Sequence, residues 1–415
     1  MRDIGDTSAS RGGNALFGPL SLALLIWAGS LKETPLFAWV PVDLTLASAA
    51  AVAVFTLDSR LRGGAATKAV AAPLLVFMLF LPAAVIVPAP TEASTSKVLT
   101  LFTISLLLAV TPFYLLRAPR QRTAFLIALV GFGLLSAANL VFAPTEVSNS
   151  PGRFVVEGSN TIAVSRIVLA AAVILLIAAT VRGLKLALRV LTAILAVALT
   201  AVATLTGSRG PLIALLLAVG VTVITASVYR KYRVRAVLGL AAVAGVGGWY
   251  LLQSSQTAGL ARIISALTGD AGSGPDVRAA IWSYTYELFL AQPFGSGWGT
   301  FDYFGTPYPH NLLLEVAVEA GILVLIAVVC LLVMSLVRGA REAVDWQTTA
   351  MLSLFVFAFA NAMVSSDING NRLLLVTAFA IWAVGKRQES TNPVDREVAD
   401  PPRMRSVATR GAHSG

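Results

Sequence analysis

The chain has two histidines, and one of them, His310, directly precedes a long apolar stretch. It lies in the segment YPHNLLLEVAVEAG, residues 308–321. A neutral imidazole accepts a proton near pH 7 without strong tuning, so His310 is a candidate general base. Nearby arginines and the positive end of a helix would lower its pKa and keep it neutral. The alternative is a helix-capping or interfacial histidine with no chemical role.

Two arginines have sequence contexts that suit anion binding. Arg209 lies in the turn LTGSRGPL, where glycines on both sides allow close approach to the backbone. Pro211 starts the next helix, whose free N–H groups and dipole favour an anion. Arg278 begins another predicted helix, with Trp282 one turn later. The alternatives are that Arg209 binds loop carbonyls or lipid phosphate, and that Arg278 is a surface arginine beside an interfacial tryptophan.

Two carboxylates follow the histidine on the same predicted helix. Glu315 and Glu319 are four positions apart and therefore share a face. We expect them to support the site by pairing with an arginine such as Arg209 or Arg372, and either is an alternative base. His310 ranks above them because of its position and its titration range.

Helices that cross a membrane must position these residues. The chain of 415 residues is 57% hydrophobic and 13% charged, whereas soluble domains carry about 25% charged residues. Its apolar runs have the length that a helix needs to span a bilayer, and a helix satisfies its own backbone in lipid. The sequence therefore predicts an all-α polytopic membrane protein with about twelve transmembrane helices, near residues 14–30, 36–56, 68–88, 98–116, 123–143, 163–181, 186–206, 210–229, 235–252, 310–337, 347–365 and 371–385.

The net charge of +10 is distributed as the positive-inside rule requires. With a cytoplasmic N-terminus, 23 of the 31 Lys and Arg residues lie on the inside. This excess orients the chain and gives no reason to expect nucleic-acid binding. The basic residues left on the outside are Lys32, Lys97, Arg153, Arg166, Arg209, Arg262, Arg278 and Arg372. A charge near membrane depth is costly, so each outside arginine is a functional candidate.

The chain divides into five predicted parts. They are a cytoplasmic N-terminus (1–13), nine transmembrane helices (14–252), an extracytoplasmic loop (253–309), three transmembrane helices (310–386) and a flexible cytoplasmic tail (387–415). Within the loop, Val277, Ile281, Tyr284 and Leu288 recur at helical spacing, which predicts an amphipathic helix at the membrane surface with its apolar face down. The following segment, rich in Gly, Pro and aromatic residues, predicts a tightly turned loop.

The order of these motifs resembles the O-antigen ligase and O-antigen polymerase superfamily. The similar parts are TGSRG, then a long outside loop with R-x-x-x-W and P-x-G-x-G, then PHN followed by L-E-x-x-x-E-x-G, over about residues 204–325. The segment GRFVVEGSNTIA at 152–163 is weakly similar to an outside loop of that family. The resemblance covers about a third of the chain, while the predicted layout fits throughout.

This resemblance implies a glycosyltransferase, related to the GT-C fold, at the outer face of the cytoplasmic membrane. It would transfer a glycan from a polyprenyl diphosphate to a hydroxyl of a glycan, lipid or protein acceptor, as a ligase or as a polymerase. The family's essential arginines and histidine correspond to Arg209, Arg278 and His310. Around them we expect a substrate-binding set of Arg153, Trp282, Tyr308 and Asn311, with Asn311 orienting His310 or holding a sugar hydroxyl.

Neither a metal nor a cofactor is expected. The one cysteine excludes a cysteine metal site, and the first outside loop, SLKETPLFA, lacks the paired acidic motif of metal-dependent GT-C enzymes. The rival class is a twelve-helix transporter or flippase. A major-facilitator transporter would place its long loop inside between helices six and seven, whereas this chain has only VRGLKLA there. The transporter reading explains neither the outside arginines nor the long outside loop.

Overall fold

The computed structural model describes residues 8–32, 34–35, 37–62, 69–86, 91–147, 153–180, 184–226, 229–231 and 274–384. The predicted ninth span (235–252), the first part of the predicted loop (253–273) and the predicted tail (387–415) lie outside the described residues. All statements below concern the described part.

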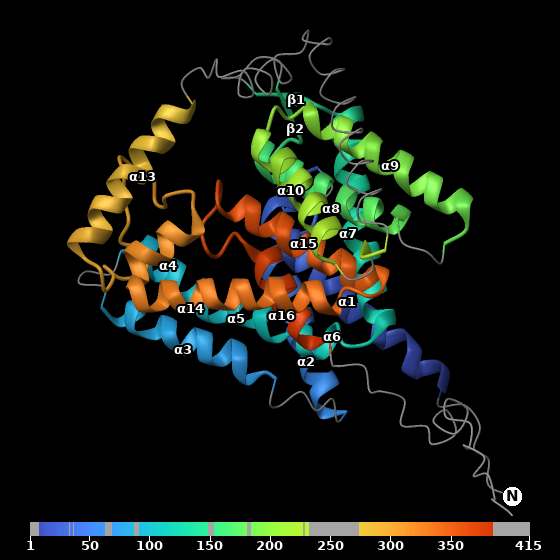
Figure 1. Ribbon diagram of the computed structural model, residues 1–415, viewed down its shortest axis with the longest axis horizontal. Helices are drawn as coiled ribbons and strands as arrows, with labels where there is room; N and C mark the ends of the chain where they lie inside the picture. The colour runs from blue at the N-terminus through green and yellow to red at the C-terminus, as the bar shows by residue number, and fades with distance from the viewer. Residues whose placement is uncertain are drawn as a thin grey trace, which may run out of the picture. The chain divides into compact units, whose positions relative to one another are not determined.

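Nearly all of the described secondary structure is helical (Figure 1). In chain order the elements are α1 (Ser8–Leu31), α2 (Leu44–Leu61), α3 (Ala71–Val85), α4 (Glu92–Thr100), the π-helix η1 (Leu101–Ser105), α5 (Leu106–Val110), α6 (Pro112–Leu115), α7 (Pro119–Phe142), β1 (Thr145–Glu146), β2 (Phe154–Val155), α8 (Thr161–Thr180), α9 (Leu186–Thr204), α10 (Arg209–Thr225), α13 (Gly274–Ala291), α14 (Leu312–Glu342), α15 (Trp346–Ala362) and α16 (Arg372–Ala383). The strands β1 and β2 pair antiparallel.

Six described helices are long and apolar enough to cross a membrane. They are Leu44–Leu61, Glu92–Leu115, Pro119–Phe142, Thr161–Thr180, Leu186–Thr204 and Ile322–Glu342. Four shorter apolar helices cover Leu16–Leu31, Ala71–Val85, Arg209–Thr225 and Arg372–Ala383. The predicted mostly helical chain is therefore confirmed, and its six apolar helices are consistent with an all-α membrane protein, whereas the number of twelve spans stays a prediction.

The predicted second span begins too early. We expected it at 36–56, but α2 starts at Leu44. Asp43 is the reason, because its carboxylate accepts hydrogen bonds from the backbone N–H groups of Thr45 and Leu46 and so caps the helix. An acidic cap just inside an apolar run sets the true start of this helix.

Helix α8 lies at the centre of one group of helices. It packs against α7, α9, α10 and α15 (Figure 1), and the run from Val168 to Val173 is fully buried. A second group forms around α14, which packs against α3, α13, α15 and α16. Helix α15 belongs to both groups and joins them.

Helix α14 is broken at Gly321, which has φ 84° and ψ 176°. The predicted tenth span, 310–337, is therefore wrong as one continuous helix, and the part that is long and apolar enough to cross a membrane is Ile322–Glu342. A neighbouring loop completes the break: Ser296 N–H donates to the Val318 carbonyl, and Ile322 N–H donates to the Pro293 carbonyl. These bonds satisfy backbone groups that the break removes from the helix.

Helix α13 contains the predicted loop helix. Its residue Ile281 is buried and packs with Phe301 and Val318, and Tyr284 stacks on Phe301 with ring centroids 6.0 Å apart. Ile281, Tyr284 and Leu288 of the predicted apolar face thus pack against α14 or the loop before it, and Figure 1 shows α13 (yellow) beside α14 (orange). The position of this helix at the membrane surface stays a prediction.

Candidate active site

One end of the bundle brings several helix termini together through polar contacts. Asn369 Nδ2 donates to the Lys97 carbonyl over 2.9 Å, which joins the turn before α16 to α4. Arg372 Nη1 donates to the Leu25 carbonyl over 2.9 Å, which joins α16 to α1. Glu315 and Glu319 contact Lys97 at this end, and His310 lies on the turn just before the helix that carries both glutamates.

His310 lies on the turn that leads into α14. Its backbone has φ 56°, a left-handed conformation that is uncommon for a residue with a side chain. Its ring is half-buried, with the Tyr308 ring edge-on at a centroid distance of 4.6 Å. Asn311 follows as the N-cap of α14, and its side-chain oxygen accepts hydrogen bonds from Leu313 N–H and Leu314 N–H. Asn311 is thus a helix cap that fixes the turn carrying His310.

Helix α13 is anchored to the same turn by its tryptophan. Trp282 Nε1–H donates to the Pro309 carbonyl over 3.0 Å. Arg278 lies one helical turn before Trp282, and its positive charge acts on His310. Burial, followed by the charge of Arg278, lowers the pKa of His310 below its usual value of about 6.5. The sequence predicted this direction, although burial rather than charge is the larger cause.

Arg209 is the first residue of α10 and is half-buried. The preceding turn is held by the strand segment at 153–155: Phe154 N–H donates to the Leu205 carbonyl, and Arg153 Nε donates to the Thr206 carbonyl over 2.9 Å. Arg153, predicted to bind substrate, therefore supports the turn that carries Arg209. A Cβ at Gly210 would lie 3.1 Å from Val364, so this glycine lets α10 approach the end of α15 closely.

Lys97 forms a buried charge cluster with Glu315 and Glu319 of α14. Its Nζ lies 2.6 Å from Glu315 Oε1 and 2.6 Å from Glu319 Oε2, and both glutamates are fully buried. The sequence expectation that these glutamates pair with Arg209 or Arg372 is corrected, because Lys97 takes that place. The spacing of the two glutamates on one helix face did predict a cationic partner. No local sequence pattern identified Lys97 as that partner.

Two glycines show why the loop before α14 and the break within α14 match each other. A Cβ at Gly321 would lie 2.4 Å from the Phe294 carbonyl group, and a Cβ at Gly295 would lie 2.6 Å from the Glu319 carbonyl oxygen. Both residues have positive φ, at 84° and 95°. No residue with a side chain fits these positions without displacement of the backbone. The loop therefore docks into the broken helix by direct backbone contact.

The segment that carries most of these site residues matches the model of a known protein family. Residues 194–329 match the family model for O-antigen ligase. This match covers about a third of the chain and supports an O-antigen ligase or polymerase superfamily assignment. No curated protein matches the chain. The O-antigen ligase domain begins within α9 and ends within α14, so it contains Arg209, Arg278, His310, Glu315 and Glu319.

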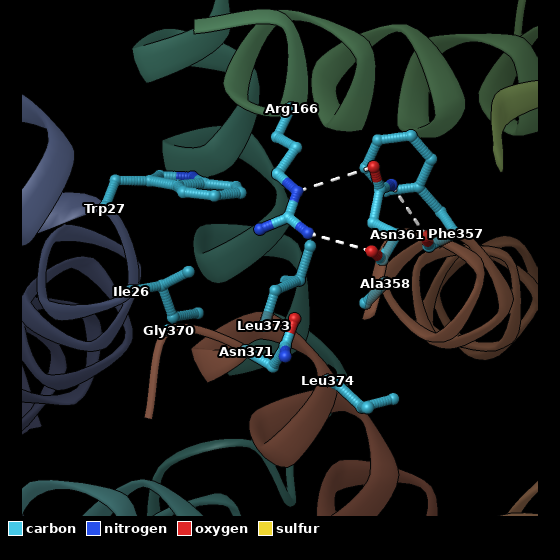
Figure 2. Close-up of a pocket in the computed structure, with 10 residues that line it drawn as sticks. All are labelled: Ile26, Trp27, Arg166, Phe357, Ala358, Asn361, Gly370, Asn371, Leu373 and Leu374. Carbon is cyan, nitrogen blue, oxygen red and sulfur yellow. Dashed lines mark hydrogen bonds between the residues drawn. The ribbon is translucent and has the colours of Figure 1, made fainter. Parts of the chain in front are cut away.

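Helices outside the matched O-antigen ligase domain complete this end of the bundle. Arg166 on α8 was not predicted as a site residue. Its Nη2 donates to the Asn361 carbonyl over 3.0 Å (Figure 2) and to the Ser365 carbonyl over 3.1 Å. Its charge also acts on the hydroxyl of Tyr308. Burial, then the Asp367 and Glu315 carboxylates, raise the pKa of Tyr308. The only sequence signal for Arg166 was an outside arginine near the start of a predicted span.

Arg372 does not support the glutamates. Its charge acts on Asp367 and Asp43, in addition to its bond to the Leu25 carbonyl. Within the described ranges, no group of three or more His, Cys, Asp or Glu residues could hold a metal ion. The polar groups that the O-antigen ligase domain and its flanking helices gather are therefore arginine, lysine, histidine, carboxylate and amide side chains.

Proposed function

We propose that this protein is a membrane glycosyltransferase that moves a glycan from a polyprenyl diphosphate to an acceptor hydroxyl at the outer face of the cytoplasmic membrane. The match of residues 194–329 to the O-antigen ligase family model supports a ligase- or polymerase-type transferase. The observation that supports the mechanism best is that half-buried His310 lies within electrostatic reach of Arg278. A half-buried imidazole with a lowered pKa stays neutral near pH 7, beside a cation suited to phosphate.

In the proposed reaction, a hydroxyl of the acceptor attacks the anomeric carbon of the lipid-linked glycan. A new bond forms between the acceptor oxygen and the anomeric carbon, while the bond from that carbon to the phosphate oxygen breaks. His310 takes the hydroxyl proton, and the electron pair of the broken bond leaves with the lipid diphosphate. Because one direct displacement occurs, the configuration of the anomeric carbon inverts.

The arginines stabilise the leaving group in this scheme. Negative charge on the diphosphate grows as the glycosidic bond breaks, and an arginine fork binds phosphate oxygens bidentately. A preorganised donor of this kind stabilises the transition state, and its removal raises the activation barrier by about 3–4 kcal/mol. We assign this role to Arg209 and Arg278, and we expect a GT-C-like, metal-independent enzyme.

An apolar groove offers a place for the prenyl chain. It lies between α3, α14 and α16, and Phe77, Phe80, Val316 and Leu332 are among its lining residues. Leu312, two positions after His310, lies at the same groove. An apolar chain bound here would hold its diphosphate near the turn that carries the proposed base.

The decisive experiment is transfer by the purified chain in detergent with a polyprenyl-diphosphate glycan and no ion gradient. The expected result is a covalent product, detected by mass spectrometry, for the parent chain and for His413→Ala. His310→Ala should lose about 10²–10⁴ of the rate, the contribution of a general base. Movement of substrate into liposomes without bond formation would instead support a transporter.

The identity of the acceptor distinguishes a ligase from a polymerase. A polymerase would extend a second lipid-linked glycan, whereas a ligase would use a different lipid, a protein or another glycan. Offering both acceptor classes in the same assay distinguishes the two activities, since the donor and the chemistry are shared.

A further inference from the structure

A small cavity lies between α1, α8, α15 and α16. Arg166 enters it from α8, between Trp27 of α1 and Asn361 of α15 (Figure 2). Gly370, in the exposed turn before α16, belongs to the lining as well. Arg166 also acts electrostatically on Tyr308, which precedes His310 by two positions.

The Arg166 guanidinium is only partly used by the protein. Nε contacts Asn361 Oδ1 at 3.4 Å and Nη2 donates to two carbonyls, whereas Nη1 makes no hydrogen bond to any described residue. A guanidinium carries five N–H donors, so its remaining donors are available to a ligand. The two carbonyl bonds hold the fork in one orientation.

The charge of Arg166 has no balancing carboxylate. In the described part of the chain, no Asp or Glu lies within ion-pair distance of Arg166, and its acceptors are neutral amide groups. A cation held within a membrane-spanning helix without a counter-charge is costly. An anion in the cavity would supply the missing charge.

A second donor borders the cavity. Trp27 is 7% exposed, and its Nε1–H has no hydrogen-bond partner among the described residues. A buried N–H group without a partner costs free energy, so such groups are normally satisfied by protein, water or ligand. Trp27 and Arg166 are therefore two unsatisfied donor groups at one cavity.

From these observations we infer that the cavity of Arg166 and Trp27 binds an oxyanion of the phosphate class. The guanidinium of Arg166 is fixed in orientation and carries an uncompensated positive charge, and the indole N–H of Trp27 is a second donor. Together they would bind phosphate oxygens more strongly than they would bind a neutral hydroxyl group or water. Naming the diphosphate of the lipid-linked donor as the occupant rests on the proposed function. Free phosphate or pyrophosphate has the same chemistry and is the other source.

The test is binding by the full chain in a maltoside detergent, which contains no phosphate. The probes are polyprenyl diphosphate, inorganic pyrophosphate and polyprenol, the same lipid without its diphosphate. Trp27→Phe removes the N–H and keeps an aromatic ring, and Arg166→Lys keeps the charge without the fork. The matched controls are Trp382→Phe and Arg338→Lys, because Trp382 donates to Ser335 and Arg338 to the Ile381 and Val384 carbonyls, away from the cavity.

We expect Trp27→Phe to weaken polyprenyl diphosphate binding by about fivefold to tenfold and Arg166→Lys by more than tenfold. The controls should stay within about twofold of the parent chain, and polyprenol should bind all folded variants equally. Inorganic pyrophosphate that shows the same losses identifies a site open to free phosphate. Losses confined to the lipid diphosphate identify the donor as the source.

Unchanged diphosphate binding in Trp27→Phe would overturn the inference, and so would an equal loss of polyprenol, which would indicate a packing defect. Should Arg166→Lys fail to fold, Trp27→Phe still decides, since it keeps an aromatic ring and the polyprenol probe reports any packing defect. Failure of the proposed function is separate, because it appears as absence of transfer by the parent chain. Diphosphate binding that depends on Trp27 would support the oxyanion site whether or not transfer occurs.

Discussion

Lys97 on α4 and Glu319 on α14 form a buried ion pair, with Nζ and Oε2 2.6 Å apart although 222 positions separate them in the chain. Glu315, one turn earlier on α14, shares the same ammonium group. The backbone N–H of Phe301 approaches Glu319 Oε1 at 3.4 Å. This one cluster therefore ties α4, α14 and the loop before α14 together, beside the turn that carries His310.

We predict that Lys97→Met strongly destabilises the protein. Removing the ammonium leaves two fully buried carboxylates without a counter-charge, and breaking a buried pair in this way costs about 3–5 kcal/mol. The measurement is the thermal unfolding midpoint of the purified chain in detergent. Lys32→Met is the control, since Lys32 and Asp43 form an exposed pair 3.9 Å apart, a type that contributes about 0–1 kcal/mol. Equal midpoints for the two variants would contradict this role for Lys97.

The Lys97 cluster shows where sequence reasoning stopped. The apolar runs predicted most of the described helices, because length and hydropathy are local properties of the chain. The spacing of Glu315 and Glu319 likewise predicted a shared face and a cation. Lys97 was not identified, since its contact with α14 depends on how distant helices pack, and one chain carries no direct record of that packing.

The break at Gly321 was missed for a related reason. A glycine within an apolar helix is tolerated, so its presence alone does not predict an interruption. The break forms because backbone groups of residues 293–297 replace the helical hydrogen bonds, and that loop is contributed by a different part of the chain. The motif order nonetheless pointed to the segment that contains both the loop and the break.

We predict that Gly321→Ala disrupts the docking of this loop. Its Cβ would lie 2.4 Å from the Phe294 carbonyl group, and its positive φ adds about 1–2 kcal/mol of backbone strain. Gly305→Ala is a matched control, because Gly305 has a similar φ of 82° with nothing within 4 Å of its Cβ. The Gly305→Ala control should lose only the stability that backbone strain costs, because its Cβ meets no neighbouring atom. Limited proteolysis and thermal unfolding of both variants compare the two effects, and a Gly305→Ala loss as large as that of Gly321→Ala would rule out crowding as the cause.

The pH dependence of transfer should follow the lowered pKa of His310. A base works in its deprotonated form, so activity should rise with pH through the pKa of His310, and the midpoint of this rise should lie below the ordinary histidine value. Arg278→Gln removes a positive charge that disfavours the imidazolium. The pKa of His310 should then rise, while burial still holds it down.

Histidine NMR titration in a His413→Gln background measures this shift directly, since His310 is then the single histidine of the chain. The pKa should move upward in Arg278→Gln and stay unchanged in Arg338→Gln, whose guanidinium binds carbonyls of α16 and the residue after it. A downward or absent shift in Arg278→Gln would mean that its charge does not reach the imidazole.

The last prediction concerns the shape of the Arg209 side chain rather than its charge. Arg209→Lys keeps one positive charge at the start of α10 but loses the planar fork that binds two phosphate oxygens. If Arg209 stabilises the departing diphosphate, the rate of transfer should fall by about 10²–10³, the loss typical of removing one preorganised donor. Arg153→Lys is an informative companion, because Arg153 supports the same turn through the Thr206 carbonyl and should act mainly on thermal stability. Full activity in Arg209→Lys would show that charge alone suffices and that bidentate binding plays no part. Loss of activity in Arg153→Lys without loss of stability would assign Arg153 itself to the substrate.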